Sequence, residues 1–164
     1  MNGPLLLARW SKRGGSPLGR ARFSRALGAA VPYSGTIRPH VLEFEPGRAR
    51  VLIKDRRRIR NHLGSIHAIA LVNLGELTSG LALLASLPPS MRGIVRGLSV
   101  EYKQKARGTL IAICNCGPGP EDGTHDTEVI AHIHDAEGDE VATVRVDWRI
   151  GPVKKNRQQP SATP

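Results

Sequence analysis

The chain has 164 residues, the size of one ordinary domain. Its hydrophobic fraction of 40% excludes a disordered or fibrous protein, and its aromatic fraction of 4% predicts a core built from aliphatic side chains. The formal net charge of +10 is concentrated at the front, because residues 1–60 hold 14 Lys and Arg against three acids. Such a front is expected to attract polyanions such as nucleic acid, anionic lipid or a phosphate-rich cofactor.

Cysteine usage and hydropathy favour an intracellular protein. Cys114 and Cys116 lie one residue apart and therefore cannot frame a disulfide scaffold. The longest apolar stretch, residues 66–87, carries Glu76 near its middle, which is unlike a membrane span. We expect a cytoplasmic location. A mitochondrial matrix location stays open, because residues 1–42 are Arg-rich and acid-free like a presequence.

The first 31 residues are predicted to form a basic helical lead, since apolar residues recur at helical spacing on either side of Gly14-Gly15 and Pro17. This lead either packs as a flap on the following domain or anchors the protein to an anionic surface. The period then changes to two. Residues 41–45 and 49–54 alternate around a Pro-Gly turn and predict a hairpin in which Leu42 and Phe44 share a face.

One long helix is predicted over residues 66–87, with Ser65 as its N-cap and Pro88-Pro89 ending it. Alternating apolar residues predict four further strands near residues 98–103, 110–115, 129–134 and 142–148. A helix that is apolar nearly all round should be enclosed by a strongly curved antiparallel sheet, so the fold class is α+β. We expect the domain to cover residues 32–152 and the polar tail, residues 153–164, to be disordered.

Glu76 is the most informative residue of the helix. A carboxylate among Leu and Gly side chains must be paired, hydrated or neutralised, and burial would raise its pKa toward the range useful for proton transfer. The alternative is a solvated strip of the helix shared with Asn73 and Ser79.

The loop before the helix supplies the complementary chemistry. Backbone N–H groups near His67 and Ala68 lack intrahelical partners and lie at the positive end of the helix dipole, where they favour an electron-rich carbonyl. His67 and Glu76 are nine residues apart, or about 900° of helical rotation, and therefore lie on opposite sides of a continuous helix. The two residues face one site only if His67 precedes the regular helix or if two copies share the site, which favours a homodimer.

Asn61, Gly64, His67 and Glu76 resemble the motif of hotdog-fold thioesterases of the phenylacetate-pathway and thioesterase-superfamily-member type. Both spacings are kept: Asn61 to Glu76 is fifteen residues and His67 to Glu76 is nine. Residues 32–152 look more closely like an uncharacterised bacterial and fungal branch of the hotdog superfamily. The resemblance implies a curved sheet wrapped around a central helix, with dimers that either remain dimers or pair into tetramers.

The resemblance also implies an acyl-CoA-type substrate, with coenzyme A part of that substrate and no separate cofactor. Glu76 of the neighbouring subunit would then activate water or attack the thioester carbonyl, the Ala68 amide would polarise that carbonyl, and Asn61 and His67 would position substrate or water. The sequence departs from the family motif in reading His-Ala-Ile where relatives read His-Gly-Gly. It also carries Val95 where some members have Ser or Thr. Both departures point to a narrowed substrate range or a lost activity.

The sequence leaves other functions open. The His62-to-Glu76 spacing of fourteen residues matches hydroxyacyl thioester dehydratases, but the Phe-Pro-Gly that those enzymes carry is absent. A non-catalytic module binding an acyl chain or acyl-CoA and a polyanion-binding front are further alternatives, although the scarcity of aromatic residues disfavours nucleic acid. Two more sets of side chains have ligand-binding chemistry. The candidates for coenzyme A phosphates are Arg58, Arg60, Lys105 and Arg107. The candidate metal ligands are His125, His132 and His134, and we predict no metal site because no Cys or matched acid accompanies them.

Overall fold

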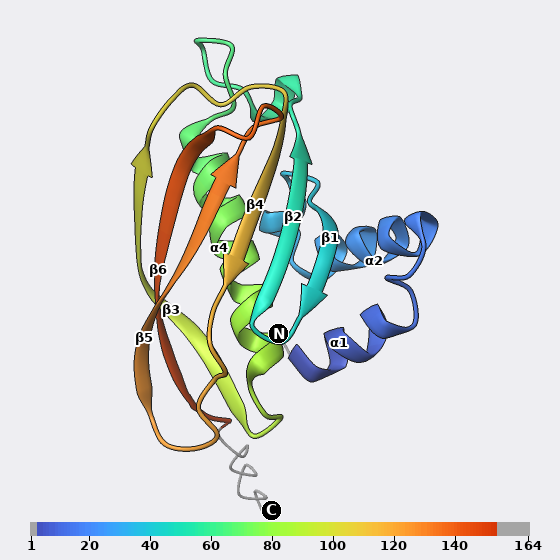
Figure 1. Cartoon of the computed structure of the whole chain (residues 1–164), viewed down its shortest axis with the longest axis vertical. Coiled ribbons are helices and arrows are strands. Elements are labelled where there is room, and N and C mark those ends of the chain that lie inside the picture. Colours follow the sequence, from blue (N-terminus) through green and yellow to red (C-terminus); the bar gives the residue numbers. More distant parts are fainter. Residues whose placement is uncertain (1–2, 154–164) are drawn as a thin grey trace, which may run out of the picture.

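The computed structural model describes residues 3–153, in which a six-stranded sheet curves around one long helix (Figure 1). Every neighbouring pair of strands is antiparallel, and the strand order is β1-β2-β4-β5-β6-β3. This is the α+β architecture that the hotdog resemblance implies. The predicted disordered tail lies outside the described residues except for Val153.

The elements follow the predicted order, with one short helix and one 3₁₀ turn (η1) in addition. The helices are α1 (Gly3–Ser11), α2 (Pro17–Ala30), α3 (Pro32–Gly35) and α4 (Ala68–Ser86), and η1 spans Arg57–Ile59. The strands are β1 (His40–Glu45), β2 (Arg48–Lys54), β3 (Met91–Tyr102), β4 (Thr109–Asn115), β5 (His125–His134) and β6 (Glu140–Pro152).

Helix α4 is enclosed because its backbone approaches the sheet closely. A Cβ added at Gly75 would lie 2.4 Å from the Val144 Cβ of β6, so only glycine allows this distance. By length and composition α4 would also suffice to cross a membrane, but here it is the mostly buried core helix of the sheet. Its apolar circumference therefore reflects burial on nearly all sides.

The helix begins two residues later than predicted, and Ser65 is not its N-cap. His67 is the cap: its backbone is extended and its Nδ1 accepts a hydrogen bond from the Ile69 N–H at 3.1 Å. Ser65 is buried in the preceding loop, and its hydroxyl donates to the Asn61 side chain. The prediction failed because a histidine ring can accept at a helix start as serine does.

The first strand also differs in register from the prediction. A bulge between Val41 and Glu43 shifts the pairing of β1 with β2. Val41 and Phe44 are therefore both buried in the core, whereas Leu42 is only half-buried. Alternation along the sequence assumes a regular strand and therefore cannot predict the extra residue of a bulge.

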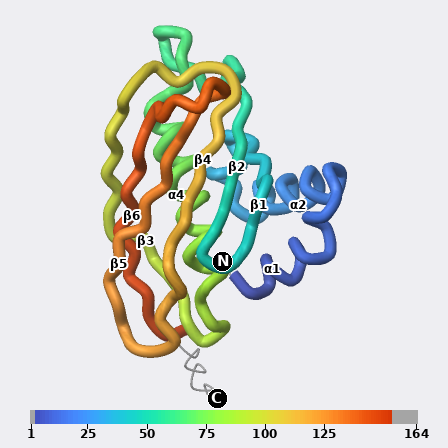
Figure 2. The backbone as a smooth tube through the Cα atoms, viewed as in Figure 1, coloured from blue at the N-terminus to red at the C-terminus, as the bar shows by residue number. Residues whose placement is uncertain are grey.

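The basic lead packs on the domain. Phe23 and Leu27 of α2 are buried in the common core, and the Trp10 ring of α1 lies 5.1 Å from that of Phe23 and 6.2 Å from that of Phe44. Figure 2 shows α1 and α2 at the β1 side of the sheet. At residues 3–30 the structure thus agrees with the flap interpretation.

The two edges of the sheet are unlike. At the β1 edge, the Ser24 hydroxyl of α2 accepts from the Val41 N–H at 2.9 Å, and Arg20 donates to the Leu42 carbonyl. The β3 edge has no second neighbour among residues 3–153. This twelve-residue strand exposes three large apolar side chains, Ile94, Leu98 and Tyr102.

Candidate active site

The loop before α4 is held in one conformation by its own polar groups. The Asn61 Oδ1 accepts from the N–H groups of Leu63 (2.9 Å) and Ser65 (3.2 Å) and from the Ser65 hydroxyl (3.3 Å). Gly64 completes the turn with a φ of 73°, a conformation that favours glycine. Asn61 therefore shapes this loop, a structural task that the sequence pattern did not reveal.

Backbone hydrogen bonds fasten the same loop to its surroundings. The Ile66 N–H donates to the Ala106 carbonyl at 2.8 Å and the His67 N–H donates to the Ile59 carbonyl at 2.7 Å. The segment between β3 and β4 thereby lies against the start of α4, at the same end of the molecule (Figure 2). The first turn of α4 is rigidly placed as a result.

A cavity of about 330 Å³ lies between these two segments. Three predicted site residues line it: Asn61, Ala68 and Lys105. Ala68 is the first residue of α4, and its N–H has no hydrogen-bond acceptor among residues 3–153. Tyr102 also lines the cavity, and partial burial raises the pKa of its phenol. Nothing in the sequence marked Tyr102, which is simply the last residue of its strand.

Glu76 lies elsewhere on α4, half-buried, on a strip that the sheet leaves open. Exposed Ile69 and half-buried Val72 precede it at helical spacing, and beyond Glu76 every residue from Leu77 to Ala85 is buried. Burial raises the pKa of the Glu76 carboxyl. No group within residues 3–153 hydrogen-bonds or pairs with this carboxylate.

A second polar group accompanies Glu76 on this side of the helix. Asn73 lies one turn earlier, and its Nδ2 donates to the Tyr33 carbonyl of α3 at 3.3 Å. Its buried Oδ1 has no partner in the described part of the chain. The strip therefore combines apolar side chains with two acceptor groups that lack donors.

The acid and the free amide are separated within one chain. Ala68 and Glu76 are eight residues apart on one helix, which corresponds to about 12 Å along its axis. His67 is exposed, and its ring is occupied as the helix cap. The fold thus brings Asn61, Ala68 and Lys105 together and leaves His67 and Glu76 outside their cavity. His62, the dehydratase candidate, is exposed in the loop and does not line the cavity either.

The candidate phosphate-binding cations are all exposed. Arg60 forms two hydrogen bonds with Asp55, at 2.7 and 3.2 Å, and this contact lowers the pKa of the Asp55 carboxyl. Arg107 adds its positive charge near the same carboxylate. Arg58 lies on η1, and Lys105 is the member of the set that lines the cavity.

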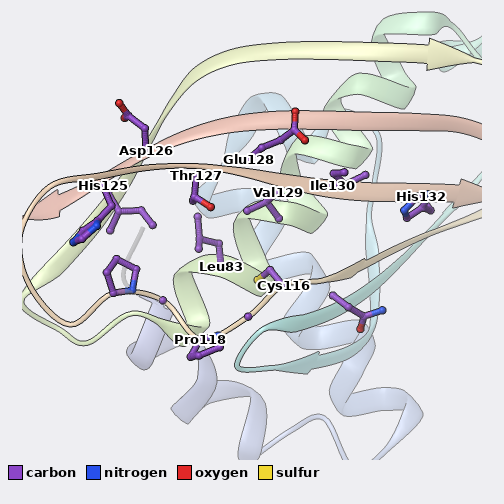
Figure 3. A pocket seen from close by; sticks show the side chains of 15 residues that line it. Leu83, Cys116, Pro118, His125, Asp126, Thr127, Glu128, Val129, Ile130 and His132 are labelled. Carbon is purple, nitrogen blue, oxygen red and sulfur yellow. The ribbon is translucent and has the colours of Figure 1, made fainter.

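A larger cavity, of about 760 Å³, lies at the seam where β4 and β5 diverge (Figure 3). Strand β5 pairs with β4 only from Ala131 onward, so its first half faces the loop that carries Cys116 and Pro118 across the cavity, and Leu83 of α4 also lines it. No predicted catalytic residue lines this seam. Two of its polar side chains already have partners on β6: Asp126 with Arg149 and His132 with Glu140.

The three histidines weighed as metal ligands are spread along β5. His125 bonds to the Asp122 carbonyl at 2.7 Å, and the His132 Nδ1 lies 2.7 Å from Glu140. Within residues 3–153 no three His, Cys, Asp or Glu side chains are grouped as metal ligands would be.

Comparison with known protein families shows which family the chain belongs to. The model of a family described as a domain of unknown function, DUF4442, matches residues 19–150. The chain belongs to the DUF4442 family. The match begins within α2, so this DUF4442 protein shares part of its basic lead, as well as the sheet, with the family.

Solved structures confirm the hotdog fold of this DUF4442 chain. The structural-genomics protein APC5556 is 30% identical with a TM-score of 0.79, covering 91% of this chain and 99% of its own. A probable thioesterase, PA5026 of Pseudomonas aeruginosa, is 21% identical with a TM-score of 0.69 over 93% and 99%. The protein smu.793 of Streptococcus mutans, bound to acetyl CoA, is 20% identical with a TM-score of 0.60 over 71% and 91%. Comparison with curated proteins gives no match.

Proposed function

We propose that this protein is a homodimeric thioesterase that hydrolyses an acyl-CoA-type thioester. The carrying observation is Glu76: a half-buried carboxyl with a raised pKa and no donor within the described residues, on an open apolar strip of the core helix. Similarity in fold to a probable thioesterase and to an acetyl CoA-bound protein supports the substrate class.

The second copy completes the site in this proposal. The free Ala68 N–H lies about 12 Å along the helix from the Glu76 of its own chain, too far for both to act on one carbonyl. The exposed β3 edge offers backbone groups and apolar side chains for pairing with a twofold-related copy. Such pairing sets two α4 helices antiparallel and brings Glu76 of one copy toward Ala68 of the other.

The chemistry follows from these two groups. The Glu76 carboxylate takes a proton from water as the water oxygen attacks the thioester carbonyl, and the Ala68 N–H donates to the oxygen on which negative charge develops. When the carbon–sulfur bond breaks, the thiolate of coenzyme A leaves and takes up the proton. In an alternative route the carboxylate attacks the carbonyl directly and expels the coenzyme A thiolate, and water then hydrolyses the resulting anhydride. A raised pKa suits the first route, because the acid then titrates nearer neutral pH.

Mixed dimers test both the residues and the shared site. Glu76→Ala removes the acid. Ala68→Pro removes the N–H and adds two ring carbons, and it suits the first helical position because His67 already has the extended backbone (φ −65°, ψ 140°) that precedes proline. Each variant alone should lose thioester hydrolysis. After unfolding and refolding of an equal mixture, about a quarter of wild-type activity should return, because about half of the dimers carry one complete site.

Several outcomes would contradict the proposal. Full activity in Glu76→Ala removes this acid from the mechanism, and no recovery in the mixture places both groups in one chain. Failure of the wild type to hydrolyse acyl-CoAs of every chain length, together with stabilisation by them, would favour a binding module. Ile69 favours that second candidate: its side chain is 52% exposed directly after the Ala68 amide, where relatives have glycine, and it narrows the approach to that N–H.

A further inference from the structure

A further cavity, of about 470 Å³, lies between α2, α3 and the start of β1. Its lining includes two arginines, Arg25 and Arg38, together with His40. The volume is within the range of small-molecule sites. None of the residues assigned to thioester hydrolysis lines this cavity.

The positive charge around this cavity is not neutralised. Neither Arg25 nor Arg38 pairs with an acid within the described residues, and residues 1–42 contain no Asp or Glu. Burial, and then the charges of Arg20 and Lys54, lower the pKa of His40. A cluster of cations without acids is destabilised by mutual repulsion, and a bound anion relieves that repulsion.

The cavity wall is fixed before any ligand arrives. α2 and α3 touch backbone to backbone, since a Cβ on Gly35 would lie 2.3 Å from the Gly28 carbonyl oxygen. Ser24 donates to Arg20 and accepts from the Val41 N–H, so it ties α2 to β1.

Arg38 itself has a φ of 50°, the left-handed region that side chains disfavour. Among residues 3–153 it is the one non-glycine residue with a positive φ. Strained residues of this kind concentrate at ligand sites.

We propose that this α2–α3 cavity binds the phosphate groups of a small phosphorylated molecule through the guanidinium groups of Arg25 and Arg38. Guanidinium forks match phosphate oxygens in geometry and charge. The phosphate belongs either to coenzyme A or to a separate phosphorylated ligand.

A nucleic acid fits this cavity less well. The cations line a hollow between helices, and Trp10 and Phe23 pack against Phe44, so Tyr33 is the one strongly exposed aromatic ring on α1–α3 within residues 3–153. Single-stranded nucleic acid needs exposed rings on which bases stack.

Calorimetric titration of the full chain with pyrophosphate tests the site. Arg38→Gly removes the guanidinium and relieves the backbone strain, so it should fold at least as well as the wild type yet bind pyrophosphate about tenfold more weakly. Arg25→Ala should weaken binding similarly. Arg22→Ala is the matched control: it removes one exposed arginine of α2 that does not line the cavity, and it should change affinity less than twofold.

The outcomes separate the alternatives. Equal losses of affinity in all three variants would reveal a diffuse basic surface. Tighter binding of an oligonucleotide than of pyrophosphate would indicate a nucleic-acid site. Either result would overturn the proposal, and so would a failure of the wild type to bind pyrophosphate. Competition by coenzyme A, with a raised KM and unchanged kcat in Arg38→Gly, would identify the phosphate as that of the substrate. Binding without such competition would identify a separate ligand. The titration is independent of whether thioesters are hydrolysed.

Discussion

Gly75→Ala tests the close approach of α4 to β6 at Gly75. The added methyl group would lie 2.4 Å from the Val144 Cβ and 2.5 and 2.8 Å from its two methyl carbons, where ordinary contacts begin near 3.4 Å. The Cβ is fixed to the backbone and cannot rotate away. Helix and strand must therefore separate by about 1 Å, and overpacking of this kind costs about 2–3 kcal/mol.

Replacing a helical glycine by alanine returns about 1 kcal/mol through helix propensity. The free energy of unfolding of Gly75→Ala should therefore fall by about 1–2 kcal/mol, measured as a lower urea midpoint at unchanged slope. Gly80→Ala is the matched control, because its nearest atoms are on the Trp148 ring at 3.2 and 3.3 Å, which can shift; we expect a change within about 1 kcal/mol.

A double variant sharpens this test. Val144→Ala removes the two methyl groups and keeps the Cβ, so in combination with Gly75→Ala it should lose less stability than the sum of the single changes. If Gly75→Ala were instead more stable than the wild type by the ordinary propensity gain, α4 would not lie this close to β6.

Three further predictions concern titration and the loop. Burial raises the folded-state pKa of Glu76, so the ionised carboxylate destabilises the folded protein. Glu76→Gln should therefore raise the urea midpoint at pH 7. This gain should vanish below pH 4.5, where the wild-type acid is protonated in both the folded and the unfolded protein. The pKa of Glu140 is lowered to about 2, chiefly by the Lys103 ammonium and the Thr143 hydroxyl, so Glu140→Gln should lower the midpoint at pH 7, with the difference closing as the pH falls from about 4.5 to about 2. A constant difference across pH would contradict either assignment. Asn61→Asp keeps an acceptor for the loop N–H groups and should retain activity better than Asn61→Ala, as measured by kcat/KM; equal losses would show that the amide nitrogen is what matters.

Sequence periodicity was enough to predict the fold class, since the all-round apolar helix and the alternating stripe ending at Trp148 are both buried as expected. Periodicity did not predict two features that depend on the backbone or the side chain of a single residue. The bulge after Val41 inserts one residue into the alternation, and the His67 ring replaces a serine cap.

The candidate site was only partly accessible from the sequence. Spacing marked Glu76 as a carboxyl in apolar surroundings, and the structure agrees in burial and in the direction of its pKa. Residue spacing could not show that the Asn61 Oδ1 accepts hydrogen bonds from its own loop, or that Arg60 pairs with Asp55. These contacts depend on the conformation of the loops. If a second chain supplies the group that faces Glu76, the sequence pattern of one chain cannot identify that group either.

The unlike edges of the sheet limit how large an assembly can grow. At one end of the strand order, side chains of α2 bond to two backbone groups of β1, and at the other end β3 has no second neighbour among residues 3–153. Two copies joined through β3 would expose at both ends a β1 strand that α2 partly covers, which is a poor template for a third copy. In such a dimer, α2 would disfavour the edge-to-edge addition of further copies and so limit growth into fibres.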